Sequence, residues 1–120
     1  MFKRLVILLY LLCIPAYAGI YDEALKGNKN VLLYLYTSDC RACRSFVNVY
    51  DELAKTNKDF KFVKVDAETK EGLSLMRKFR GYYVPYIVLT NPQSKKSAVI
   101  KPYCSMDSLC LERALKNFKG

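Results

Sequence analysis

The sequence predicts an α/β fold in which helices flank a four-stranded mixed sheet, and three observations lead to this prediction. Short runs of β-forming residues alternate with segments of helical periodicity along the chain. The last two predicted strands follow one another across a turn, as the strands of a hairpin do. No linker, internal repeat or low-complexity tract interrupts the chain, so we expect one domain over residues 19–120.

The first predicted element is a short helix at residues 20–26. Ile20, Ala24 and Leu25 recur on one face of it, and Gly27 follows as a helix stop. We therefore expect the helix to pack against the sheet through these three apolar side chains.

A strand, a helix and a second strand follow. Residues 31–36 form a continuous apolar run rich in β-forming residues, which is typical of a strand buried on both faces. From Cys43 onward, apolar side chains recur at helical spacing; they are Phe46, Val47, Tyr50, Leu53 and Ala54. Residues 60–65 again have strand character, and strands separated by a helix are expected to pair in parallel.

The next predicted helix is followed by two strands. Leu73, Met76 and Phe79 mark the apolar face of this helix. Residues 84–89 are predicted as a third strand with a proline at its start, where a missing N–H is tolerated. Because a helix precedes it, this strand is also expected to pair in parallel. Residues 97–100 are predicted as a fourth strand, antiparallel to the third.

A final helix is expected near the C-terminus. Ser105 can cap its first turn, because a serine hydroxyl accepts a hydrogen bond from the N–H groups at a helix start. Its apolar face consists of Leu111, Ala114, Leu115 and Phe118. The predicted order is thus a short helix followed by β-α-β-α-β-β-α, with helices on both faces of the sheet.

Residues 1–18 have the pattern of a secretion signal. Lys3 and Arg4 precede an apolar run over residues 5–14, and Ala16 and Ala18 supply the small residues that a signal peptidase reads. The run is shorter than the roughly 20 residues that a membrane-spanning helix needs. We expect cleavage after the second alanine and export of the remaining chain; an uncleaved membrane anchor is the alternative.

The chain is basic and contains no histidine. Its formal net charge is +9, and removal of Lys3 and Arg4 with the signal leaves 18 basic residues against 11 acidic ones, a net charge of +7. The lysines are scattered without interleaved aromatic residues, so weak attraction to an anionic membrane surface is favoured over nucleic-acid binding. The absence of histidine excludes Cys–His catalysis and histidine-based metal sites.

A Cys-x-x-Cys motif lies where the first predicted strand turns into a helix. Cys40 is expected at the helix N-terminus, where unpaired N–H groups and the helix dipole favour a thiolate. Arg41 and Arg44 add positive charge, whereas Asp39 opposes them unless it caps the helix. We predict that Cys40 is the outer sulfur that attacks, or is attacked, to form a mixed disulfide with the substrate. Cys43, one helical turn deeper, is predicted to resolve this mixed disulfide.

Two further cysteines remain after the signal. Cys104 follows the last predicted strand and Cys110 lies in the first turns of the final helix, so a disulfide that clips this helix is expected. An alternative is an electron relay between Cys104 and Cys40. A third possibility is a four-cysteine zinc site that includes Cys40 and Cys43.

In the order and spacing of its motifs, the chain resembles the thioredoxin family over nearly all of residues 19–120. The resemblance rests on the strand at residues 31–36, the Cys40–Cys43 motif, the strand at residues 62–66 and the dipeptide Val84-Pro85. The occurrence of both motifs is much more specific than either one alone.

The resemblance implies a cis bond between Val84 and Pro85 and places this dipeptide beside the two cysteines. The backbone of Val84 would then hold an extended substrate chain. Tyr82, Tyr83 and Tyr86 flank the proline, and tyrosines beside a cleft can contact a partner peptide. Tyr83 is therefore included with Val84 and Pro85 in the predicted substrate-binding set.

Three positions depart from the family pattern. Asp39 replaces the usual tryptophan before the first cysteine, and Arg41-Ala42 replaces the usual Gly-Pro pair. Tyr34 stands where the family usually has a buried acid that assists proton transfer. Cys43 therefore lacks an obvious proton acceptor, and water or another group must serve.

We expect a monomeric thiol–disulfide oxidoreductase that needs no bound cofactor or metal. Its substrates would be cysteine-containing exported proteins, and a separate redox partner would reset Cys40 and Cys43 after each turnover. The family resemblance behind a short signal implies the bacterial periplasm or secretion. Two alternatives remain: a redox-inactive binding module with the same fold, and a structural domain stabilised by zinc.

Overall fold

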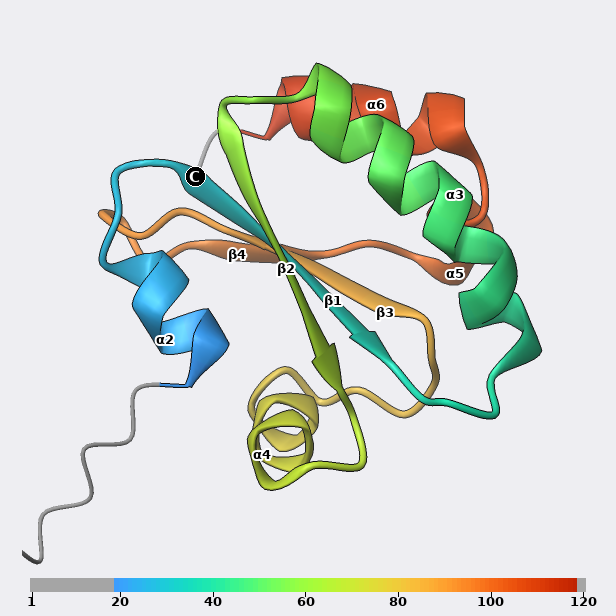
Figure 1. The fold of residues 1–120 in the computed structure, drawn as a ribbon. Coiled ribbons are helices and arrows are strands. Elements are labelled where there is room, and N and C mark those ends of the chain that lie inside the picture. The colour runs from blue at the N-terminus through green and yellow to red at the C-terminus, as the bar shows by residue number, and fades with distance from the viewer. Residues whose placement is uncertain (1–18, 119–120) are drawn as a thin grey trace, which may run out of the picture.

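A computed structural model describes residues 19–118, which form a four-stranded mixed sheet with helices on both faces (Figure 1). The predicted α/β fold class is confirmed. The predicted signal peptide at residues 1–18 lies outside the described residues. No helix in the described part of the chain is long and apolar enough to cross a membrane.

The sheet has the strand order β2–β1–β3–β4. The strands are β1 (Asn30–Tyr36), β2 (Phe60–Asp66), β3 (Tyr86–Thr90) and β4 (Ser97–Val99). β1 pairs with β2 in parallel and with β3 in antiparallel orientation, and β4 is antiparallel to β3. The predicted hairpin of the last two strands is confirmed, whereas the predicted parallel pairing of the third strand is wrong.

The short helix α4 (Lys70–Lys78) explains the antiparallel pairing of β3. Its nine residues span only about 13 Å, less than the roughly 20 Å of a seven-residue strand. Figure 1 shows it nearly end-on at one end of the sheet, so it does not carry the chain back along β2. The chain therefore enters β3 at the edge where it left β2: Tyr36 pairs with Asp66, and Leu35 pairs with Tyr86.

The helices form two layers. α2 (Ile20–Leu25) and α4 cover one face of the sheet, whereas α3 (Arg41–Thr56) and α6 (Ser108–Asn117) cover the other (Figure 1). The remaining helix of the described residues is a single short turn, α5 (Pro102–Ser105). Each face has its own apolar core, and the strand residues of β1 alternate between the two cores.

Two of the predicted helix faces differ in the structure. In α2, Tyr21 and Ala24 are buried and Ile20 is 59% exposed, because the helix presents the side next to the predicted one. In α4, Leu73 is exposed, and the buried residues are Gly72 and Leu75. Of the predicted residues, Ala24, Leu25, Met76 and Phe79 do lie in or against the core. In α4, Gly72 allows a close approach to the end of β2, which a prediction based on apolar side chains does not identify.

The predicted cap of the final helix is also wrong. Ser105 belongs to α5, which starts at Pro102, a residue suited to the first turn of a helix. The cap of α6 is Asp107, whose carboxylate accepts hydrogen bonds from the N–H groups of Leu109 and Cys110 at 3.0 and 3.3 Å. A carboxylate here also complements the positive end of the helix dipole.

Candidate redox site

The two cysteines of the motif form a disulfide at the start of α3. Their Cα atoms are 5.2 Å apart. Cys40 is the N-cap residue of the helix, and its Sγ accepts a hydrogen bond from the N–H of Cys43 at 3.0 Å. When the disulfide is reduced, this N–H and the helix dipole stabilise negative charge on the Cys40 sulfur.

Burial distinguishes the two sulfur positions. Cys43 is 3% exposed and lies within the apolar core under α3, whereas Cys40 is only half-buried. A substrate therefore reaches Cys40 first. This difference agrees with the predicted roles of attacking and resolving cysteine, which stay predictions.

The three charged residues around the motif are all exposed. Within residues 19–118, the Asp39 carboxylate accepts no hydrogen bond and caps no helix, because Cys40 itself occupies the cap position. Its negative charge therefore opposes the thiolate, as the sequence predicts for an uncapped aspartate. Arg41 and Arg44 lie in the first turn of α3 and form no ion pair with a carboxylate in the described residues.

The dipeptide Val84-Pro85 lies beside Cys40. The bond between its two residues is cis, and the Val84 carbonyl oxygen lies 3.8 Å from Cys40 Sγ. A disulfide sulfur has no hydrogen to donate, so this contact can become a hydrogen bond only in the reduced thiol form. β3 begins at Tyr86 rather than at the predicted residue 84, and the Val84 carbonyl therefore stays outside the sheet ladder.

The tyrosines before β3 differ in what they contact. The Tyr83 hydroxyl donates to the Ile100 carbonyl at 3.3 Å, and its ring packs between Tyr82 and Tyr86 with centroids 4.9 and 5.1 Å away. Tyr82 is 86% exposed. Tyr83 thus connects two segments of the chain, and its predicted contact with substrate stays a prediction. The structure shows that Tyr82 is the most exposed of the three rings. The alternation of buried and exposed residues in a strand could not predict this, because the tyrosine lies in an irregular loop.

Tyr34 lies under the motif where the family usually has an acid. It is buried, and its hydroxyl donates a hydrogen bond to the Cys43 carbonyl at 3.2 Å. Burial, with a smaller contribution from Tyr36, raises the pKa of Tyr34 to about 12. The phenol therefore stays protonated at neutral pH and cannot accept the proton of Cys43.

A small cavity of about 230 Å³ gives water access to Cys43. Its lining residues are Tyr34, Tyr36, Thr37, Ser38, Cys43, Arg44, Val47 and Lys64. Water in this cavity can accept the Cys43 proton, and the two cations on its wall favour the resulting thiolate. The sequence prediction does not include Lys64, which lies opposite Tyr34 in the β1–β2 register.

Cys104 and Cys110 form a second disulfide that joins α5 to α6, with Cα atoms 5.3 Å apart. Cys104 is buried in the core cluster that contains Cys43, and Cys40 packs against that cluster. The structure thus pairs the cysteines two by two. Among residues 19–118, no group of three or more histidine, cysteine, aspartate or glutamate side chains is placed to hold a metal ion.

The family model described as Thioredoxin matches residues 15–109 of the chain. The chain belongs to the thioredoxin family. Among its relatives, the thioredoxin of Mycoplasmoides gallisepticum is 34% identical over 53 residues, which cover 44% of this chain and 53% of that protein. Protein disulfide-isomerase 1 of Caenorhabditis elegans is 36% identical over 66 residues, which cover 52% of this chain and 14% of the relative.

The curated relatives are therefore matched over about half of their length or less. Among solved structures, oxidised thioredoxin O2 of Arabidopsis thaliana superposes with a TM-score of 0.63 at 21% identity, covering 83% of this chain and 87% of the other. This likeness shows the thioredoxin fold.

We expect the Tyr34→Phe variant of this thioredoxin-family chain to be less stable than the parent but to keep the same pH dependence of disulfide exchange. Loss of the bond to the Cys43 carbonyl should lower the free energy of unfolding by about 1 kcal/mol at pH 7. Because the folded pKa of about 12 lies above the unfolded value of 10.0, Tyr34 contributes stability below pH 10 that is lost as the pH rises towards 12. The variant should lack this loss, which is on the order of 2 kcal/mol.

Urea unfolding at several pH values measures both effects, with Tyr103→Phe as a control that removes an exposed hydroxyl. The pH profile of disulfide exchange below pH 9 should keep its midpoint in Tyr34→Phe. A shifted midpoint would mean that the phenol takes part in proton transfer after all.

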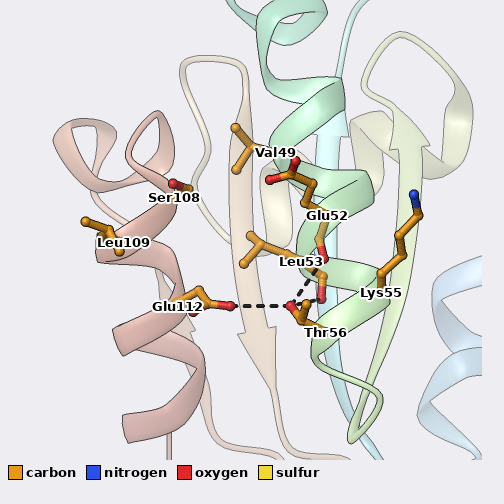
Figure 2. Close-up of a pocket in the computed structure, with 8 residues that line it drawn as sticks. All are labelled: Val49, Glu52, Leu53, Lys55, Thr56, Ser108, Leu109 and Glu112. Carbon is orange, nitrogen blue, oxygen red and sulfur yellow. Dashed lines mark hydrogen bonds between the residues drawn. The ribbon is translucent and has the colours of Figure 1, made fainter.

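A larger groove of about 370 Å³ lies between α3 and α6, away from the thioredoxin-type motif (Figure 2). Leu53, Glu112 and Thr56 meet there, and the Thr56 hydroxyl lies 3.3 Å from a Glu112 carboxylate oxygen. No cysteine lines this groove. We therefore locate the chemistry at the Cys40 edge of the sheet.

Proposed function

We propose that this chain is an exported thiol–disulfide oxidoreductase that exchanges disulfides with cysteine-containing proteins through Cys40 and Cys43. One observation carries the proposal. The half-buried Cys40 sulfur lies at a helix N-terminus and 3.8 Å from the Val84 carbonyl, while Cys43 lies beneath it within disulfide distance. The accessible sulfur, its resolving partner and a backbone edge for substrate therefore meet at one place.

The exchange follows from these positions. In the reducing direction, the Cys40 thiolate attacks a substrate disulfide, so one sulfur–sulfur bond forms and the substrate's own bond breaks. Cys43 gives its proton to water in the adjoining cavity, and its thiolate then attacks Cys40. This second step forms the Cys40–Cys43 disulfide and releases the substrate as two thiols, which take up two protons. In the oxidising direction the same steps run in reverse.

The proposal that substrates are proteins rests on the Val84 carbonyl, which lies outside the sheet ladder. An extended polypeptide can donate a backbone N–H to it while presenting its cysteine to Cys40. The family relative named protein disulfide-isomerase 1 agrees with this substrate class.

Export and an oxidising compartment are part of the same proposal. The charged start, apolar run and small residues of segment 1–18 support a signal that is removed after Ala18. The second disulfide, Cys104–Cys110, agrees with a periplasmic or secreted location, because such bonds persist in oxidising compartments. A separate redox partner would then reset the Cys40–Cys43 pair.

The experiment that tests the function is a redox titration of the protein from residue 19 onward. The protein is equilibrated in graded glutathione buffers, its free thiols are alkylated, and mass spectrometry of proteolytic fragments counts the label on Cys40 separately from that on Cys104 and Cys110. We expect the Cys40–Cys43 pair to titrate between about −270 and −120 mV. A value near about −270 mV would indicate a reductant, and one near −120 to −180 mV an oxidant or isomerase. Failure of Cys40 to react in any buffer would refute the function.

A further inference from the structure

Two aromatic side chains stand exposed at the edge of the sheet that holds the redox site. Tyr82 is 86% exposed and Tyr103 is 77% exposed, and Met106 adds a partly exposed apolar side chain. Tyrosine and methionine are enriched where proteins contact polypeptide partners, since both offer large apolar surface. Their position relative to Cys40 decides whether they can serve its substrates.

Tyr82 is linked to the Cys40 sulfur through its neighbours in the chain, Tyr83 and Val84. Its ring packs edge-on against Tyr83, with centroids 4.9 Å apart. The next residue along the chain is Val84, whose carbonyl oxygen lies 3.8 Å from Cys40 Sγ. Tyr82 therefore stands two residues from the backbone group that faces the reactive sulfur.

A second set of contacts brings Tyr103 to the same edge. The Tyr83 hydroxyl donates to the Ile100 carbonyl at 3.3 Å, and the Ile100 N–H donates to Ile87 of β3 at 2.9 Å. The chain then turns into α5, where Tyr103 points outward and Cys104 points into the core cluster against which Cys40 and Val84 pack. Figure 1 shows α5 at the end of the sheet where α3 begins, and α2 at the opposite end.

The second disulfide holds this exposed tyrosine in place. α5 has only four residues, too few for a helix that is stable by itself. The Cys104–Cys110 bond joins it to the ten-residue α6, and the Ser105 hydroxyl closes the turn by donating to the Pro102 carbonyl at 2.9 Å. An aromatic ring held on a fixed support loses less conformational entropy when it binds a partner.

We propose that Tyr82 and Tyr103 form an apolar wall beside Cys40 that binds a bulky apolar side chain close to the substrate cysteine, and that the Cys104–Cys110 disulfide positions this wall. The inference rests on the proposed function, which it deepens by naming the substrate class: extended segments with an aromatic or large aliphatic residue near the cysteine. The occupant follows from continuity with the Val84 edge. Tyr82 lies two residues before Val84 along the chain, and Tyr103 precedes Cys104, which is buried in the core cluster against which Cys40 and Val84 pack. The cysteines of the second disulfide are positioning residues.

The test compares three disulfides as partners of the reduced protein. Two are disulfide-linked peptides of otherwise identical glycine–serine sequence, with either Phe or Ser on both sides of the cysteine; the third is hydroxyethyl disulfide, which is too small to reach the wall. We expect the parent protein to react faster with the Phe peptide than with the Ser peptide. Tyr103→Ser should lower the rate ratio of the Phe peptide to hydroxyethyl disulfide about fivefold to tenfold.

Three variants make the result specific. Tyr103→Phe should keep most of the ratio, because the ring supplies the apolar contact. Ile20→Ser removes a similarly exposed apolar side chain from α2, at the opposite end of the sheet, and should leave the ratio unchanged. The double variant Cys104→Ser/Cys110→Ser should lower the ratio as Tyr103→Ser does, with thermal unfolding recorded to confirm that it is folded.

The outcomes distinguish failure of this inference from failure of the proposed function on which it rests. A parent that reacts with none of the three disulfides refutes the proposed function. A parent that reacts with all three but does not prefer the Phe peptide overturns the wall alone. If loss of Cys104 and Cys110 slows hydroxyethyl disulfide as much as the Phe peptide, the second disulfide takes part in the chemistry and does not act by positioning Tyr103.

Discussion

Replacing Cys40 by serine is expected to reduce disulfide exchange to background, a loss of at least about 10³-fold. The half-buried Cys40 sulfur is the position that a substrate reaches, and a serine hydroxyl at the same helix terminus has no comparable thiolate form. The assay is reduction of a protein disulfide, with the substrate's thiols alkylated and counted over time.

Cys43→Ser is expected to fail in a different way. Cys40 can still attack, but the variant lacks the sulfur of Cys43, the disulfide partner of Cys40 with its Cα atom 5.2 Å away, which would release the substrate. A mixed disulfide between Cys40 and the substrate should therefore accumulate and appear as a larger species on a non-reducing gel. Treatment with dithiothreitol should return both proteins to their original sizes.

The two variants together identify the attacking and the resolving cysteine, whichever way electrons flow. If Cys43→Ser were the variant that forms no adduct and Cys40→Ser the one that accumulates it, the roles would be exchanged. Exchange at the background level by the parent as well as by both variants would favour the redox-inactive binding module. Ile20→Ser provides a matched surface change far from the motif.

Secondary structure was largely predictable because it depends on local patterns. The composition of residues 31–36 and 60–65 predicts the two strands, and the motif at Cys40 marks the start of the helix between them. The pairing direction of β3 was not predictable in the same way. It depends on how far α4 carries the chain in space, and a nine-residue helix that lies across the sheet end has the same periodicity as one that runs along it.

The candidate site shows the same division. Cys40 and Cys43 could be identified from their spacing and from the strand before them. The burial of Tyr34, the cavity wall formed by Lys64 and the exposure of Tyr103 arise from pairing and packing between distant segments. Composition states that tyrosines are present, and only the fold decides which of them is buried as a neutral phenol and which faces a partner.

Sequence patterns also do not predict the role of Gly72. We expect Gly72→Ala to lower the free energy of unfolding more than any surface substitution does. Gly72 is buried in the first turn of α4, and its N–H donates to the Thr69 hydroxyl that caps the helix, at 3.0 Å. A Cβ at this position would overlap the carbonyl oxygen of Asp66 and come within 2.6 Å of the Ala67 Cα. These are backbone atoms at the end of β2, so a side-chain movement cannot relieve the clash.

The α4 helix would have to move away from β2, at a cost of about 1–3 kcal/mol or more. For a domain of this size the midpoint of thermal unfolding should fall by roughly 5–20 °C. The movement of α4 should also displace the loop beside the redox site. The Gly81 N–H donates to the Met76 carbonyl at 2.7 Å and the Tyr86 hydroxyl donates to the Phe79 carbonyl at 2.6 Å, so α4 holds the loop that carries Val84.

Gly27→Ala is the matched control for the same chemical change. The nearest atom to a Cβ at Gly27 is a carbonyl oxygen 3.5 Å away, an ordinary contact, and no glycine in residues 19–118 has a positive φ. This variant should be neutral or more stable by up to about 1 kcal/mol, because alanine reduces the freedom of the unfolded chain. Urea unfolding of the two variants decides the matter. If Gly72→Ala were as stable as Gly27→Ala, α4 would not lie as close to the end of β2 as the structure places it, and the support for the Val84 loop would have to come from elsewhere.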